Sequence, residues 1–109
     1  MTGTWVGTET DTAAGIGSLQ ATISQSGTSL SGTYSLTFTN GIFSNSGAIS
    51  GTVNGSNVLM TATPTSPTIC PTTNTATLNA TVTQITGTYA VVSGCTLSRQ
   101  TGSFTATKQ

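Results

Sequence analysis

The sequence has no histidine and very little charge, since its 109 residues include only two basic and two acidic side chains. The lack of histidine excludes an imidazole base and a histidine-ligated metal. A formal net charge of zero leaves no basic patch to attract nucleic acid or anionic lipid. No nucleophile–base pair can be assembled from the remaining residues, so we expect a non-enzymatic protein that holds no metal and no cofactor.

Long apolar runs are also absent from the sequence. No segment approaches the roughly 18 apolar residues of a membrane-spanning helix, and the N-terminus lacks the hydrophobic stretch of a signal peptide. We therefore expect no transmembrane segment.

Hydroxyl groups are what the sequence has in abundance, with 27 threonines and 14 serines beside 13 glycines. Apolar residues alternate with these hydroxyl residues at a spacing of two, which is typical of strands with one buried face. The pattern predicts an antiparallel sheet whose outer face is kept soluble by threonine and serine. The clearest example is the set Leu30, Gly32, Tyr34, Leu36 and Phe38.

Turn signals separate the alternating segments. Glycine follows serine or asparagine at several of these boundaries, and three prolines mark a long irregular stretch at about residues 64–74. The sequence therefore predicts eight strands, near residues 3–10, 16–25, 28–38, 46–53, 57–63, 75–83, 85–92 and 101–108.

An internal repeat relates the two halves of the chain, about 1–54 and 55–109. The second, third and fourth predicted strands match the sixth, seventh and eighth. One of the matches, LQATISQ with LNATVTQ, implies that the second half lacks a four-residue insert, Ser26 to Ser29. The matching segments are 19–25 with 78–84, 30–36 with 85–91, and 46–53 with 101–108.

Two four-stranded meanders predict a single all-β domain, residues 1–109, folded as an eight-stranded antiparallel up-and-down barrel. Closing the sheet removes both of its edges, and glycines with inward parity allow the coiling that a small barrel needs. A two-sheet β-sandwich made of the same two meanders is the alternative.

The two cysteines, Cys70 and Cys95, precede the sixth and follow the seventh predicted strand. We expect a disulfide that joins the open end of this hairpin, with a buried pair of free thiols as the alternative. A disulfide indicates an oxidising compartment, which favours an extracellular or periplasmic protein of the bacterial envelope. On this interpretation Met1 replaces a signal peptide or a lipoprotein anchor.

Two short motifs carry a family resemblance. TGTW at 2–5 and LSGTY at 30–34 resemble strand motifs of the avidin–streptavidin family, a meander barrel that holds biotin. More loosely, the chain is similar to the wider calycin group, which includes the lipocalins. The resemblance implies the barrel fold without the biotin site. Tyr34 matches a biotin-contacting tyrosine, but Trp5 is the only tryptophan, and Gly7 and Leu36 replace polar residues of the family.

Strand parity points four aromatic side chains into the predicted barrel, where they line a small ligand cavity or simply fill the core. Lys108 has the same parity on the last strand, where it would hold an anionic group at the barrel mouth or extend into solvent. The candidate ligand-binding residues are therefore Trp5, Tyr34, Tyr89, Phe104 and Lys108.

Four further residues have chemistry that the barrel pattern does not explain. Ile42 and Phe43 are apolar in a predicted loop, where they would cap the barrel or contact a partner. Glu9 and Asp11 share one face at the end of the first strand. Paired carboxylates can act as acid and base or bind Ca²⁺, but no other carboxylate is present to complete a calcium site. We expect them to be a solvated strand end.

These observations favour a non-enzymatic exported β-barrel module that binds a small apolar or aromatic ligand in the barrel. The alternative is a structural or adhesive surface domain. In that case the threonine and serine face, or the Ile42–Phe43 loop, would contact a protein partner or a second copy, because zero net charge lowers repulsion between copies.

Overall fold

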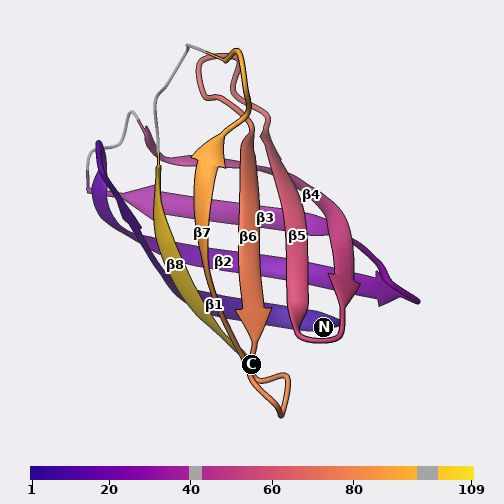
Figure 1. Cartoon of the computed structure of the whole chain (residues 1–109). Coiled ribbons are helices and arrows are strands. Elements are labelled where there is room, and N and C mark those ends of the chain that lie inside the picture. The colour runs from indigo at the N-terminus through magenta and orange to yellow at the C-terminus, as the bar shows by residue number, and fades with distance from the viewer. Residues whose placement is uncertain (40–42, 96–100) are drawn as a thin grey trace.

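Each strand pairs with the next along the chain, and the sheet closes because the first strand also pairs with the last. The computed structural model describes residues 1–39, 43–95 and 101–109. In Figure 1, the first three strands run across the direction of the last four. The strands are β1 (Gly3–Asp11), β2 (Gly15–Ser26), β3 (Ser29–Phe38), β4 (Asn45–Asn54), β5 (Asn57–Pro64), β6 (Thr72–Leu78), β7 (Gln84–Val91) and β8 (Thr101–Lys108).

All eight pairings are antiparallel, which confirms the predicted up-and-down barrel. In a β-sandwich, β1–β4 and β5–β8 would form two separate sheets. This arrangement is excluded because β4 pairs with β5 and β8 pairs with β1. In the described part of the chain, no helix is long and apolar enough to span a membrane.

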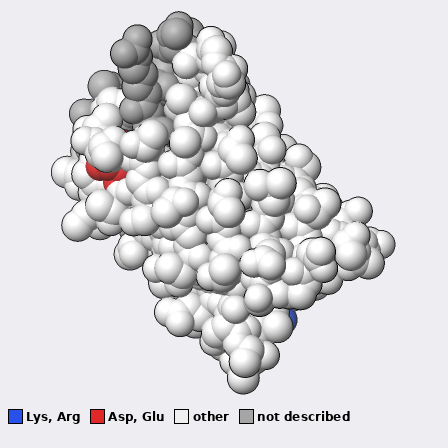
Figure 2. Space-filling model, viewed as in Figure 1, with Lys and Arg blue, Asp and Glu red and all other residues white. Residues whose placement is uncertain are grey.

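The alternation of side chains places one continuous apolar core inside the barrel and hydroxyl groups outside it. Trp5 is 1% exposed within this core. On the outer face, threonines pair with threonines across neighbouring strands, as Thr77 does with Thr86 and Thr86 with Thr105. Figure 2 shows the result, a face that is almost entirely uncharged. Hydroxyl groups therefore supply the polar surface that charged residues supply in most proteins.

The sixth strand differs from its prediction, because β6 ends at Leu78 instead of continuing to residue 83. Just beyond it, the Asn79 side-chain oxygen accepts hydrogen bonds from the backbone N–H groups of Thr83 (2.8 Å) and Gln84 (3.0 Å). This side chain therefore closes a turn in place of a further strand pairing. Ala80 and Val82, which alternation placed inside, are exposed.

The predicted deletion in the second half is wrong for the same reason. In the first half, Gln25 pairs with Leu30 across the β2–β3 hairpin, and four residues lie between them. In the second half, Leu78 pairs with Ile85, and six residues lie between them. The β6–β7 connection is therefore two residues longer than its counterpart, and the similar letters of 19–25 and 78–84 do not occupy equivalent places.

The predicted disulfide between Cys70 and Cys95 is present. It joins the β5–β6 connection to the segment that follows β7, and it lies at the end of the barrel opposite the two termini (Figure 1). Cys70 is fully buried. The bond therefore joins the chain just before β6 to the chain just after β7.

Loss of the disulfide should lower the free energy of unfolding by roughly 3.5 kcal/mol, because the unfolded chain is no longer restricted over this loop. Urea unfolding of a Cys70→Ala/Cys95→Ala variant measures the loss, and the reduced wild-type protein is the control for the removed sulfur atoms. Equal midpoints for oxidised, reduced and variant proteins would contradict the expected contribution.

Candidate functional site

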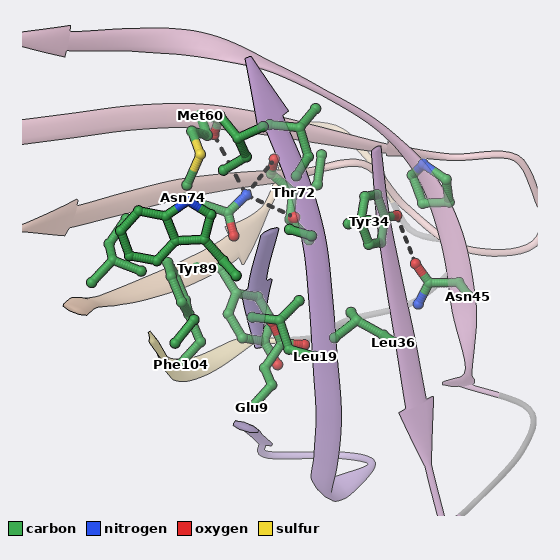
Figure 3. A pocket seen from close by; sticks show the side chains of 18 of the residues that line it. Glu9, Leu19, Tyr34, Leu36, Asn45, Met60, Thr72, Asn74, Tyr89 and Phe104 are labelled. Atoms are coloured by element: carbon green, nitrogen blue, oxygen red, sulfur yellow. Dashed lines mark hydrogen bonds between the residues drawn. The ribbon is translucent and has the colours of Figure 1, made fainter. Parts of the chain in front are cut away.

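A partly enclosed cavity of about 70 Å³ lies inside the barrel and extends to the disulfide end, where Ile69 and Cys70 line it. Strands from both halves of the chain contribute its walls (Figure 3). The wall is mostly apolar, and Met60 supplies a flexible thioether to it. The cavity is about half the size of the roughly 150 Å³ cavity that accepts benzene in a protein core.

The four aromatic residues expected from strand parity all line this cavity. Trp5, Tyr34, Tyr89 and Phe104 are each no more than 6% exposed. The Trp5 indole N–H donates a hydrogen bond to the backbone oxygen of Met1, 2.9 Å away. The chain's one tryptophan is therefore fixed in the cavity wall, where its fluorescence reports on the interior.

The two carboxylates are buried, so the expected solvated strand end is wrong. Glu9 is 6% exposed and Asp11 is 4% exposed. Both share the parity of Trp5 along β1, and this strand keeps its inner face covered up to its last residue. The chain has placed both of its acidic side chains inside the barrel.

Asp11 holds the barrel end together. One carboxylate oxygen accepts hydrogen bonds from the N–H groups of Ala13 (2.8 Å) and Ala14 (2.9 Å), which forms the turn into β2. The other oxygen accepts a hydrogen bond from the Tyr89 hydroxyl at 2.5 Å. Both carboxylate oxygens of Asp11 therefore accept hydrogen bonds that stabilise the fold.

Gly102 lets the Tyr89 side chain reach Asp11 across β8. Tyr89 pairs with Gly102, and Gly102 pairs with Asp11, so the three residues form one row across β7, β8 and β1. A methyl group at position 102 would lie 2.8 Å from the Tyr89 hydroxyl and would also collide with the backbone oxygen of Thr10. The hydrogen bond between β7 and β1 therefore requires glycine in the strand between them.

Glu9 lines the cavity but has no comparable structural role. Burial, and then the neighbouring charge of Asp11, raises the pKa of Glu9 from 4.5 to about 7, and the Tyr89 hydroxyl beside it offsets part of this rise. Burial raises the pKa of Tyr89 and of Tyr34 far above its usual range, so both phenols remain protonated at any physiological pH.

Two asparagines complete the polar part of the wall (Figure 3). Asn45 accepts a hydrogen bond from the Tyr34 hydroxyl at 2.6 Å and donates to the backbone oxygen of Phe43 at 2.8 Å. The Asn74 amide nitrogen donates to Thr72 (3.2 Å to its backbone oxygen and to its hydroxyl) and to the Met60 backbone oxygen (3.5 Å).

The remaining predicted site residues lie outside this cavity. Lys108 is exposed at the terminal end of the barrel, where its aliphatic stem lies over Gly3. Phe43 is partly buried but does not line the cavity, and Ile42 lies outside the described residues. Among the residues that the structure describes, no group of acidic, cysteine or histidine side chains could hold a metal ion.

Sequence reasoning missed Glu9 and the two asparagines as cavity residues, although a signal was present for each. Glu9 lies four residues after Trp5 and therefore on the same face of β1. Asn74 has the parity of Ala76, but it lay one residue before the predicted start of its strand. Asn45 likewise lay just before a predicted strand.

Two redesigned beta barrels among the solved structures are similar to this chain. A redesigned beta barrel, mFAP1, bound to DFHBI, has a TM-score of 0.80 and 18% sequence identity, covering 98% of this chain and 94% of its own. A second redesigned beta barrel, b11L5F_LGL, has a TM-score of 0.77 and 19% identity, covering 99% and 90%. These likenesses support the barrel fold, and the avidin-type relationship stays a prediction. No protein-family model and no curated protein matches the sequence.

Gly102→Ala should destabilise the barrel by about 1–3 kcal/mol, because the added methyl group forces β1 and β8 apart. Ser103→Ala is the matched control, since Ser103 is the exposed neighbour on the same strand. Chemical unfolding compares the two variants with wild type. A Gly102→Ala protein as stable as the Ser103→Ala protein would show that the seam tolerates a side chain.

The free energy of unfolding should fall by about 3 kcal/mol as pH rises from 4.5 to above 7. In this range the folded protein holds the Glu9 proton that the unfolded chain has released, so raising the pH favours unfolding. The chain has no histidine and few other titrating groups to obscure the effect. Glu9→Gln should flatten the profile in urea unfolding at several pH values, and equal slopes in both proteins would contradict the burial of an ionisable Glu9.

Proposed function

We propose that the protein is a non-enzymatic, exported binding module that takes a small aromatic or apolar molecule into its barrel. The observation that carries the proposal is the internal cavity walled by Trp5, Tyr34, Tyr89 and Phe104. Small-molecule sites are typically concave, mostly apolar and equipped with a few placed polar groups. Here Glu9, Asn45 and Asn74 are the polar groups in such a wall.

The similar barrel mFAP1 supports this proposal, since it was solved bound to DFHBI. An eight-stranded barrel has the interior width for one small ligand. The cavity must widen to accept a whole aromatic ring, and Met60 can move aside because its side chain is unbranched and rotates freely. The binding module therefore needs movement of side chains, with the sheet unchanged.

Export is supported by the disulfide, which persists in oxidising compartments. A binding role fits the site better than catalysis does. Asp11 is occupied by three hydrogen bonds. Glu9 has no free cysteine to activate, because both cysteines are joined in the disulfide, and the Tyr89 hydroxyl beside it donates its proton to Asp11.

Titration with benzyl alcohol, followed by the emission of Trp5, tests the proposal. We expect a saturable change in wild type. Met60→Ala should bind severalfold more tightly because it enlarges the cavity. Leu59→Ala is the matched control, because Leu59 immediately precedes Met60 on β5, is 52% exposed and faces outward. Its affinity should equal that of wild type.

Two results would contradict the binding module. If the change in Trp5 emission does not saturate with benzyl alcohol in either wild type or Met60→Ala, the interior is a closed core. Equal tightening in Leu59→Ala and Met60→Ala would place the probe outside the barrel. Concentration-dependent multimers together with either result would favour the structural or adhesive alternative.

A further inference from the structure

The hydrogen-bond donors of the cavity wall are almost all directed at protein acceptors. The Trp5 indole donates to Met1, the Tyr34 hydroxyl to Asn45 and the Tyr89 hydroxyl to Asp11. The Asn74 amide hydrogens face the oxygens of Thr72 and Met60. What remains is one amide hydrogen of Asn45 and the hydroxyl of Thr72.

Two strong acceptors, in contrast, are left over. The Tyr89 hydroxyl lies beside both carboxyls and has a single proton, which it donates to Asp11 at 2.5 Å, so Glu9 shares with Asp11 its one hydrogen-bond partner among the described residues. The Asn74 nitrogen is fixed by two backbone oxygens, which can only accept, and so its side-chain oxygen is left without a donor in the described structure. Glu9 is 94% buried and Asn74 is 93% buried, as their 6% and 7% exposures give.

Buried acceptors without donors cost free energy unless something supplies the missing hydrogen bonds. Figure 3 shows Asn74 and Glu9 on opposite sides of Tyr89 in this view, both on the wall of one cavity. A ligand that brings N–H donors would satisfy both groups.

The charge of the site has the same implication. Lys108 lies at the other end of the barrel, and Arg99 lies outside the described residues. The described residues at the cavity end therefore include two carboxyl groups and no cationic side chain. Among the described residues, the other titratable groups around Glu9 are Asp11, Tyr34 and Tyr89, and both tyrosines are neutral. Aromatic faces such as those of Trp5 and Tyr89 attract cations.

We infer that the ligand of this barrel carries a protonated nitrogen, an ammonium or amidinium group, which binds against Glu9 and Asn74 while its apolar part lies among the aromatic side chains. This inference rests on the proposed function and names the class of ligand. The cation donates to the carboxylate, which shares the Tyr89 hydroxyl with Asp11, and to the amide oxygen, to which no described residue donates.

Ionised Glu9 is the binding form, so affinity for a cation depends on pH. The pKa of Glu9 near 7 places its ionised fraction at about one tenth at pH 6 and about nine tenths at pH 8. A cation should therefore bind about tenfold more tightly at pH 8 than at pH 6, and its binding should release a proton.

Benzylamine, which stays protonated across this range, and benzyl alcohol, its neutral isostere, provide a matched pair of probes for Trp5 emission. At pH 8 we expect benzylamine to bind at least tenfold more tightly than benzyl alcohol. Glu9→Gln keeps the shape of the side chain and should abolish both this preference and the pH dependence. Leu59→Ala, whose exposed side chain lies outside the cavity, should leave both affinities unchanged. Asn74→Leu, which removes the amide oxygen, should weaken benzylamine severalfold more than benzyl alcohol.

The outcomes separate this inference from the proposed function. Equal affinities for the two probes, unaltered by Glu9→Gln, would overturn the inference and leave the binding module intact. Tighter binding of benzoate than of benzylamine would overturn it as well. Failure of every probe, in wild type and in Met60→Ala, would instead remove the proposed function on which the inference rests.

Discussion

Closure of the sheet between β1 and β8 is the constraint on which the rest of the structure depends. The seam is seven residue pairs long, from Trp5 with Lys108 to Asp11 with Gly102. It is extended at its two ends by backbone hydrogen bonds from Thr12 to Thr101 (2.9 Å) and from Gln109 to Thr4 (2.8 Å). Without this seam, β1 and β8 would be the two open edges of the sheet, and no closed interior would exist.

The seam also creates the polar end of the cavity. Closure brings β1 within reach of β7 across a single intervening strand, and Gly102 leaves the space through which Tyr89 contacts Asp11. The chain thus has uncharged hydroxyls outside and its two carboxyls inside, which is the reverse of the usual arrangement. Asp11 accepts three hydrogen bonds within the fold, whereas Glu9 only shares the Tyr89 hydroxyl with it. Buried ionisable groups without a structural partner are characteristic of functional sites.

Much of the fold could be predicted from the sequence, because the spacing of two is a local property. The alternation around Tyr34 fixed β3, and its repeat around Tyr89 fixed β7, with both side chains inside as expected. The end of β6 could not be predicted in this way, since Asn79 uses its side chain to form a turn within a segment that still alternates. A local pattern does not reveal that competition.

The candidate site was predictable only where it is apolar. Parity placed the aromatic residues, but the burial of Glu9 depends on how far β1 continues against β8, which is a property of the closed barrel. The same is true of Asn74, whose orientation is set by backbone oxygens of β5 and β6. The difference between Asp11, which accepts three hydrogen bonds, and Glu9, which shares one hydroxyl with it, depends on contacts between strands and is visible only in the folded structure.

The central claim is that Glu9 is a buried carboxyl that binds a cationic ligand. The titration of this carboxyl can be measured directly. Glu9 is the only glutamate, so labelling with glutamate carrying ¹³C at the side-chain carboxyl gives a single resonance. Its titration by NMR should have a midpoint near pH 7, and saturating benzylamine should move that midpoint to lower pH. A midpoint near 4.5 that benzylamine leaves unchanged would contradict the account.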